Sequence, residues 1–407
     1  MRKTSVPTGW ARTLAVLALA GVMAACSSKP ERPKPAELAP SAALIGVRQA
    51  WTARVGEVNF PLQPQVSGST LAVAAGDGTV AMLDAATGRD IWRAAAGAPL
   101  SAGVGSDGRV AAVVTTANEV VALADGKVLW RQKLAAQVYT APLVAGARVF
   151  VLAADRSVSA FDGQTGRRLW SQQRPGEPLV LRQAGVMLAV GDTLVVGQAG
   201  RLVGLNPLSG SARWDAPVAT PRGTNDIERL VDLVAGVSRV GDTVCVRAFQ
   251  ASVGCVNTAR GAVLWSRAAN ASVGVGGDDR NVFGTESDGR VVSWRRSDGE
   301  RAWSSDRLQY RALTAPLAVG ASRPRQLGTH RFDCIGAHEP GFGPWEACSL
   351  FSPMFEFADM PAAEATALAV LQGLFEAPAA AAPKPAPVAV PAPPEPSRRG
   401  FLFGARP

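Results

Sequence analysis

The sequence of 407 residues is poor in the side chains that most often carry out chemistry. Its two histidines are His330 and His338, and there is none between Cys26 and Gly320. That span therefore cannot form a Ser-His-Asp or Cys-His arrangement, or a metal site built on histidine. No Cys-Cys pair occurs, and no run of about 20 apolar residues that would span a bilayer follows the N-terminus. These absences disfavour most enzyme classes.

Tryptophan, in contrast, is frequent and regularly spaced. The segments Gly78–Trp92 and Ser157–Trp170 each combine an apolar strand, an Asp-x-x-Thr-Gly turn and a final Trp. Four weaker copies and one fragment without preceding strands end at further tryptophans: Trp130, Trp214, Trp265, Trp303 and, for the fragment, Trp51. From Trp51 the successive intervals are 41, 38, 40, 44, 51 and 38 residues, about one four-stranded blade each.

This repeat predicts an all-β fold, a β-propeller. Runs such as Arg148–Leu152 and Ser157–Phe161 alternate with turn residues, so each unit is an antiparallel meander that buries its apolar faces only against neighbours. Four aspartates are explained by turns rather than by acid-base chemistry: Asp84, Asp125, Asp162 and Asp298. We expect each Trp to fill the gap to the next blade, and the Trp51 fragment to be a lone strand that completes the last blade.

The repeat resembles the tryptophan-docking repeat of the pyrroloquinoline-quinone propellers, which usually have eight blades. About six blades are intact between residues 46 and 320, and Thr314–Val319 begins a seventh. After Gly320 every repeat feature is lost. We interpret residues 321–376 as an out-of-frame reading of the last blades, with a divergent C-terminal extension as the alternative. Residues 377–407, rich in Pro and Ala, predict a disordered tail.

The N-terminus predicts export and lipid anchoring. Residues 1–25 read as a signal peptide, with basic residues before the apolar stretch Leu14–Met23. The sequence before Cys26 resembles a lipoprotein signal, in which the Cys is acylated (palmitate) and Ser27 implies sorting to the outer membrane. Cleavage after Ala25 with an incidental Cys is the alternative. Residues 26–45 form a tether, so the body would hang from the membrane in the periplasm, an oxidising compartment.

Two further features bear on binding and redox state. The net charge of +9 is spread singly over the surface, and an exported chain does not meet nucleic acid, so a basic surface is the interpretation we adopt. Cys245 and Cys255 lie on opposite arms of a predicted hairpin around Gln250. We expect a structural disulfide there, with a redox site or reduced core thiols as alternatives.

The two longest intervals predict loops that project from a face of the propeller. One contains residues 174–182 and the other residues 220–232, and they belong to neighbouring blades. Each mixes apolar residues with arginine and acid, which is typical of protein interfaces.

With its lipoprotein signal, tether, lone first Trp and docking repeats, the chain resembles the BamB family, lipoproteins of the bacterial outer-membrane β-barrel assembly machinery. The resemblance covers roughly Cys26 to Gly320. It implies a non-enzymatic scaffold without a cofactor that binds the periplasmic POTRA domains of BamA and assists insertion of β-barrel proteins. The residues that match the family's two BamA-binding stretches are Leu179, Leu181, Arg182, Arg229, Leu230 and Asp232; an acid expected at position 234 is Val here.

Two other functions stay open. One is a periplasmic quinone-dependent dehydrogenase, which shares the repeat but typically has adjacent cysteines near its cofactor. The other is capture of unfolded β-barrel clients by strand addition, for which no residue in the sequence identifies a site.

Overall fold

The computed structural model describes residues 33–38, 49–174, 179–316, 322–327, 330–339, 343–348 and 368. The signal peptide, Cys26 and the predicted disordered tail lie outside these residues. The chain divides into two compact units, residues 1–319 and residues 320–407, which are described separately below.

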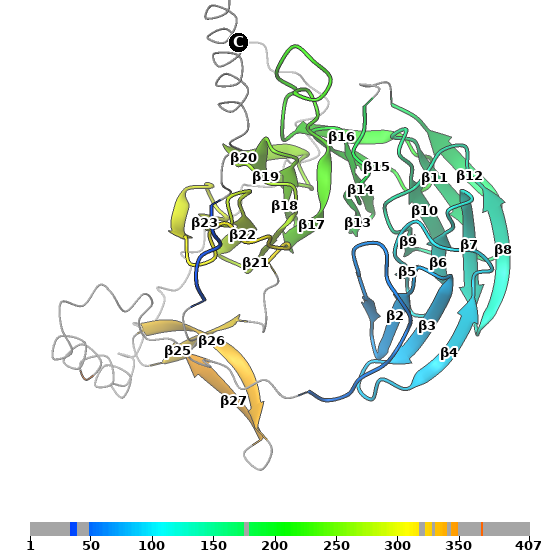
Figure 1. Cartoon of the computed structure of the whole chain (residues 1–407), viewed down its shortest axis with the longest axis horizontal. Coiled ribbons are helices and arrows are strands. Elements are labelled where there is room, and N and C mark those ends of the chain that lie inside the picture. Colours follow the sequence, from blue (N-terminus) through cyan, green and yellow to red (C-terminus); the bar gives the residue numbers. More distant parts are fainter. Residues whose placement is uncertain are drawn as a thin grey trace, which may run out of the picture. The chain divides into compact units, whose positions relative to one another are not determined.

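The first unit consists of six four-stranded antiparallel sheets that follow one another in chain order as an arc of blades (Figure 1). In each blade the strands pair in sequence order, as the meander prediction requires. The strands of blades one to three are β1 (Gln65–Ser67), β2 (Thr70–Ala74), β3 (Thr79–Asp84), β4 (Asp90–Ala95), β5 (Gly105–Ser106), β6 (Ala111–Val114), β7 (Glu119–Ala124), β8 (Lys127–Lys133), β9 (Leu143–Ala145), β10 (Arg148–Leu152), β11 (Val158–Asp162) and β12 (Arg168–Gln172).

Blades four to six repeat the same order. Their strands are β13 (Met187–Val190), β14 (Thr193–Gln198), β15 (Arg201–Leu205), β16 (Ala212–Pro217), β17 (Leu233–Val240), β18 (Thr243–Ala248), β19 (Ser252–Asn257), β20 (Ala262–Ala268), β21 (Val275–Gly277), β22 (Asn281–Thr285), β23 (Val291–Arg295) and β24 (Arg301–Ser305). In all six blades the pairing of the third and fourth strands contains a register shift just before the turn. Such a bulge increases the local twist of the outer strand.

The core lies between the blades. Val80 and Met82 of blade one pack against Val113 and Val121 of blade two, and all four are almost completely buried. Buried Val, Ala and Leu residues predominate in the second and third strands of the blades, whereas most residues of the outer strands are exposed. This pattern places the apolar contacts between neighbouring faces, as a propeller requires.

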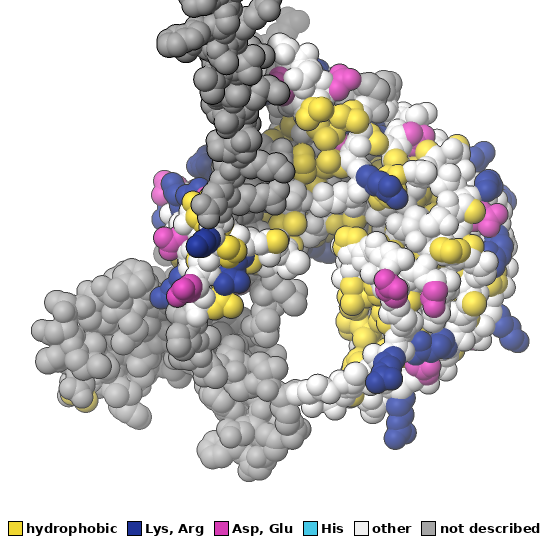
Figure 2. Space-filling view, viewed as in Figure 1, with side chains coloured by type: hydrophobic (Ala, Val, Ile, Leu, Met, Phe, Trp, Pro, Cys, Tyr) yellow, Lys and Arg dark blue, Asp and Glu magenta, His cyan; other side chains and the backbone are white. Residues whose placement is uncertain are grey.

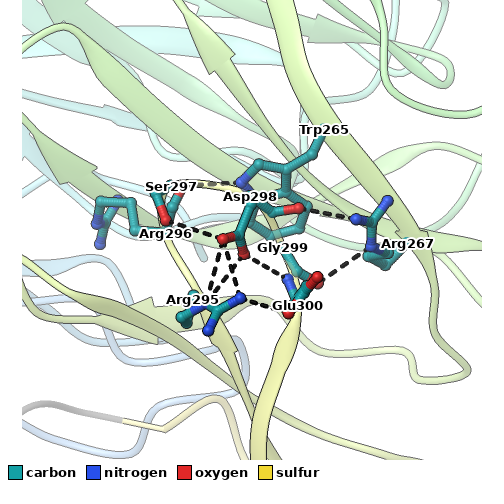
Figure 3. Close-up of polar contacts among 8 residues, drawn as sticks. All are labelled: Trp265, Arg267, Arg295, Arg296, Ser297, Asp298, Gly299 and Glu300. Carbon is teal, nitrogen blue, oxygen red and sulfur yellow. Dashed lines mark hydrogen bonds and ion pairs between the residues drawn. The ribbon is translucent and has the colours of Figure 1, made fainter.

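Tryptophans join consecutive blades. The Trp130 indole donates from Nε1 to the carbonyl of Gly163 in the next blade at 2.9 Å, and Trp265 donates to Arg296 at 2.8 Å. The turn glycine packs under the indole: Gly166 has a φ of 70°, and a methyl group there would overlap Trp130. In the last of these turns Arg295 replaces the first aspartate and pairs with Asp298 instead (Figure 3).

Two details of the predicted architecture are corrected. Trp51 docks on the first blade and donates to the carbonyl of Ala85 at 3.1 Å, but residues 49–64 contain no strand. The strands it was expected to pair with belong to a last blade that the first unit does not form among its described residues. Residues 314–316, the start of the expected seventh blade, also form no strand, and residues 317–319 lie outside the described part.

The described part of the second unit contains one antiparallel sheet. Its three strands are β25 (Ser322–Leu327), β26 (His330–Glu339) and β27 (Gly343–Cys348). Over the described residues of the whole chain, no helix has the length and apolar character needed to cross a membrane.

Candidate partner-binding site

The two long loops connect neighbouring blades. Residues 173–186 lead from β12 to β13, and residues 218–232 lead from β16 to β17; of the first loop, residues 175–178 lie outside the described part. Both loops run from the outer strand of one blade to the inner strand of the next. They therefore emerge at equivalent places of adjacent blades.

Asp232 ties the second loop to the first. One carboxylate oxygen accepts a hydrogen bond from the Leu181 amide at 3.1 Å, and the other lies 3.3 Å from Nη2 of Arg156. The Asp232 side chain is only 17% exposed. A bridge between Gly185 and Val234 continues the pairing of the two segments. The loops are thus held as one surface.

Arg156 lies beneath this surface. It comes from the turn between β10 and β11, has a left-handed backbone with a φ of 63°, and its residue is 8% exposed. Its Nη2 also donates to the carbonyl of Leu179 at 3.1 Å, so one guanidinium contacts both loops. The carbonyl of Arg156 accepts a hydrogen bond from the buried Gln198 at 2.9 Å, which fixes the turn against blade four.

The first loop presents an apolar residue and a cation. Leu179 is 38% exposed, and Arg182 is exposed with its guanidinium 5.7 Å from the centre of the Tyr139 ring. That distance permits a cation–π contact, which holds the arginine on the surface. Leu181 is half-buried and lines a small cavity of about 50 Å³ together with Asp232.

The rest of the second loop forms a capped turn. The Glu228 amide donates to the Asn225 side chain, and the Glu228 carboxylate accepts from the Thr224 amide, both at 2.9 Å. The hydrogen bond from Thr224 lowers the pKa of Glu228. Ile227, at the tip, is 78% exposed. Leu230 lines a groove of about 520 Å³ that Phe249, in the β18–β19 turn, also lines.

The structure separates the predicted residues into two groups. Leu179, Leu181 and Asp232 lie around Arg156, with Arg182 beside them, whereas Arg229 and Leu230 belong to the turn at residues 225–230. Both Asp232 oxygens have partners within the chain, so this side chain positions the loops. Val234, where an acid was expected, is buried.

Sequence reasoning did not find three residues of this surface. Arg156 and Tyr139 precede the loops in the chain, and no local motif marks them. Ile227 belongs to the second loop but matches no position of the family stretches. Its isolation among polar residues, from Thr224 to Glu228, was the available signal.

The hairpin cysteines lie in the same blade as the second loop. Cys245 and Cys255 are direct partners of β18 and β19, with Cα atoms 4.0 Å apart, and are joined by a disulfide. Both are completely buried. Arg296 of blade six donates to the Cys245 sulfur at 3.2 Å and to the carbonyl of Asp278 at 2.9 Å, and burial lowers the pKa of its guanidinium.

Among the described residues, no group of three or more His, Cys, Asp or Glu side chains is arranged to hold a metal ion.

The C-terminal part of the chain is similar to a different family. Residues 309–404 match the family model described as the [NiFe]-hydrogenase assembly chaperone HybE. Over 90 residues the chain is 50% identical to Protein HoxT of Cupriavidus necator, which corresponds to 22% of this chain and 47% of that protein. A shifted reading frame does not encode such a similarity. The match therefore weighs against the out-of-frame interpretation of residues 321–376.

The propeller is similar to proteins of one family. Residues 76–305 match the family model of outer membrane protein assembly factor BamB. The chain is 37% identical over 309 residues to the protein of that name from Bordetella pertussis, covering 75% of this chain and 80% of that one. The crystal structure of BamB from Moraxella catarrhalis shares the fold, with a TM-score of 0.56 at 21% identity over 69% of this chain and 83% of that chain. Through its propeller, the chain belongs to the BamB family of outer membrane protein assembly factors.

Proposed function

We propose that the protein is a non-enzymatic scaffold that binds the POTRA domains of BamA and assists the assembly of β-barrel outer-membrane proteins. One observation carries this proposal. Two loops from adjacent blade junctions are joined through Asp232 and Arg156, and together they present Leu179 and Arg182 to solvent. The family membership supports the same role.

The residues divide into contacting and positioning groups in this proposal. Leu179 and Ile227 supply exposed apolar area, and Arg182 supplies a charge that sets the orientation of an acidic partner surface. Asp232 and Arg156 do not contact the partner. They hold the two loops in register, which lowers the ordering cost of binding.

The location of the scaffold follows from the N-terminus. We propose that Cys26 carries the lipid and that the propeller faces the periplasm from the outer membrane. Metabolic labelling with palmitate is expected to mark the parent chain and to miss Cys26→Ser. Unchanged labelling of that variant would contradict the assignment.

Affinity for BamA tests the contact surface. The purified POTRA domains of BamA are titrated with the chain, and Arg182→Glu is expected to weaken binding about tenfold because it removes a favourable charge and adds a repulsive one. Arg168→Glu, an exposed reversal on β12 outside the loops, is the control and should leave the affinity unchanged. Equal affinities for the parent and Arg182→Glu would remove this residue from the interface.

The dehydrogenase alternative has its own test. A pyrroloquinoline-quinone cofactor with Ca²⁺ stabilises a protein that binds it, and the midpoint of thermal unfolding then rises. We expect no shift for this chain. A rise in the unfolding midpoint that depends on both the quinone and Ca²⁺ would support the dehydrogenase interpretation.

A second function is proposed for the C-terminal part. The 50% identity to Protein HoxT over 90 residues favours a role of residues 309–404 in [NiFe]-hydrogenase assembly. The chain spans about half of that relative, so the role is tested directly. Replacing the chromosomal copy by a chain without residues 321–407 should lower hydrogenase activity and leave BamA binding intact. Full hydrogenase activity would overturn the second function.

A further inference from the structure

Blade six ends in an exposed aromatic surface. In the described part of the chain, two aromatic side chains occur among the exposed large apolar residues, Trp303 and Tyr310, and each is 46% exposed. Trp303 lies on β24, the outer strand of blade six, and Tyr310 lies in the loop that follows. Leu38, in the nearby N-terminal segment, is 64% exposed. Other outer strands carry exposed aliphatic residues, such as Ile91 on β4 and Leu264 on β20, but no exposed aromatic residue among those described.

Among the described residues, no docking turn is left for Trp303. Seven repeat tryptophans face six turn glycines, and six of the tryptophans pack on those glycines: Trp51 on Gly88, Trp92 on Gly126, Trp130 on Gly166, Trp170 on Gly210, Trp214 on Gly261 and Trp265 on Gly299. In a second copy of the chain, the same six turn glycines would be covered by that copy's own tryptophans. The turns of the described part therefore offer Trp303 no partner.

The tether meets this blade. The Ala36 amide donates to the carbonyl of Gln309 at 2.9 Å, and Arg311 donates to the carbonyl of Ala36 from Nε at 3.0 Å and from Nη2 at 2.6 Å. Ala36 lies ten positions after Cys26, and an extended chain of that length spans at most about 35 Å. A lipid on Cys26 would keep this end of the propeller close to the membrane.

Charge on the same strand and loop favours an anionic surface. Arg301 and Trp303 both lie on β24, the edge strand of the blade. The register shift pairs Trp303 with Ser293 and Arg301 with Trp294, so their side chains flank this edge on opposite faces. Arg301 and Arg307 are exposed and have no ion-pair partner among the described residues. Figure 2 shows basic and apolar side chains gathered over blade six, with acidic groups between them. Aromatic and basic side chains together are typical of surfaces that lie at lipid headgroups.

We propose that the outer edge of blade six, with Trp303, Tyr310, Arg301 and Arg307, rests on the headgroups of an anionic lipid surface. The docked tether brings this edge to the bilayer, and the contact fixes how the propeller is oriented on the membrane. The inference rests on the proposed acylation of Cys26 for its location, but the lipid contact itself does not require the anchor.

Vesicle binding of the unlipidated chain tests the contact. Full-length Cys26→Ser is mixed with vesicles of phosphatidylethanolamine and phosphatidylglycerol, or with phosphatidylcholine alone, and the bound fraction is measured by flotation. We expect stronger binding to the anionic vesicles. Arg301→Glu should weaken it about fivefold or more. Arg168→Glu, which occupies the equivalent position two residues before Trp170, should have no effect.

A second measurement locates the aromatic side chain. Lipids brominated in their acyl chains quench tryptophan fluorescence at the membrane surface, and we expect Trp303→Phe to remove most of the quenching. Equal loss of binding by Arg301→Glu and Arg168→Glu, or unchanged quenching after Trp303→Phe, would overturn the proposal. It is also overturned if light scattering shows a dimer that Trp303→Ala dissolves, or if Trp303 is already shielded from a soluble quencher in the vesicle-free chain.

These outcomes are distinct from failure of the scaffold function. Arg301→Glu lies outside the two loops and should bind the BamA POTRA domains like the parent chain. If vesicle binding holds while palmitate labelling of Cys26 fails, the anchor is wrong and the lipid contact stands. If POTRA binding holds while vesicle binding fails, the scaffold stands and blade six does not face lipid.

Discussion

Trp170 of blade three and Trp303 of blade six show what a blade gains from its successor. Each packs on a phenylalanine of its own blade: the ring centres of Phe150 and Trp170 are 6.0 Å apart, and those of Phe283 and Trp303 are 5.9 Å apart. Trp170 also donates to the carbonyl of Pro207 at 3.0 Å and packs on Gly210 of the next blade. Among the described residues Trp303 has no such turn, and it is 46% exposed.

The difference shows that the repeat sequence alone does not bury its tryptophan. The indole forms one half of the contact. The other half, a left-handed glycine with a backbone carbonyl nearby, comes 34 to 47 residues later in the chain. Stability of the array is therefore concentrated at junctions between blades. Among the described residues, the last blade is supported on one side only, which leaves its outer face exposed.

The largest effect is expected from removing a buried docking tryptophan. Trp265 is 5% exposed and contacts the turn of blade six, so Trp265→Ala leaves a cavity and should lower the free energy of unfolding by about 3–5 kcal/mol. Trp303→Ala, in the equivalent position of the next blade, should cost less than about 1 kcal/mol. Urea unfolding followed by circular dichroism measures both. Equal losses would mean that Trp303 is buried by another part of the chain.

A smaller effect is expected from the glycine side of the same contact. Gly166→Ala combines a left-handed backbone with overlap against the Trp130 indole and should cost about 2–4 kcal/mol. Gly146 has a φ of 58° but no atom within 4 Å of an added methyl group, so Gly146→Ala should cost only about 1–2 kcal/mol. The same unfolding experiment applies. A difference near zero would show that the backbone, not the indole, requires glycine.

The docking contacts were predictable because the sequence motifs that form them are short. The Asp-x-x-Thr-Gly turn, the interval to the next Trp and the hairpin around Gln250 each depend on residues a few positions apart. Gln250 is indeed the left-handed residue of a three-residue turn between β18 and β19, with a φ of 48°. Counting the repeats of this motif then gave the number of blades.

Contacts between distant residues were not predictable in this way. Asp232 was expected to face a partner, but Arg156, 76 positions earlier, and the Leu181 amide occupy its oxygens. Arg247 is completely buried on a strand that the pattern treats as apolar, where Glu286 of the next blade pairs with it at 3.2 Å. Loss of the repeat after Gly320 likewise indicates where the repeats stop, but it does not show which proteins the remaining residues are similar to.

The smallest effect concerns the turn carboxylates. Hydrogen bonds from the backbone and hydroxyl of Thr165 lower the pKa of Asp162 below 3.8, whereas the pKa of Asp298 is lowered by the Glu300 amide and by Arg295. Because both folded-state values are depressed, their stabilisation is present above about pH 4 and is lost as the pH falls through them. In Asp162→Asn the free energy of unfolding should therefore fall less steeply than in the parent chain as the pH drops below about 4.

Salt separates the two kinds of turn. Arg295 pairs with Asp298 on an exposed surface, so the contribution of this ion pair to stability should shrink as ionic strength rises. Asp162 accepts hydrogen bonds from neutral backbone amides, and their contribution should respond less to salt. Acid unfolding of Asp162→Asn and Asp298→Asn at low and high salt measures this, with the exposed Asp226→Asn as control. If salt changes the stability loss of both variants equally, Arg295 does not set the last turn apart from the others. Among the described residues, blade six would then differ from the other blades in the missing docking turn for Trp303.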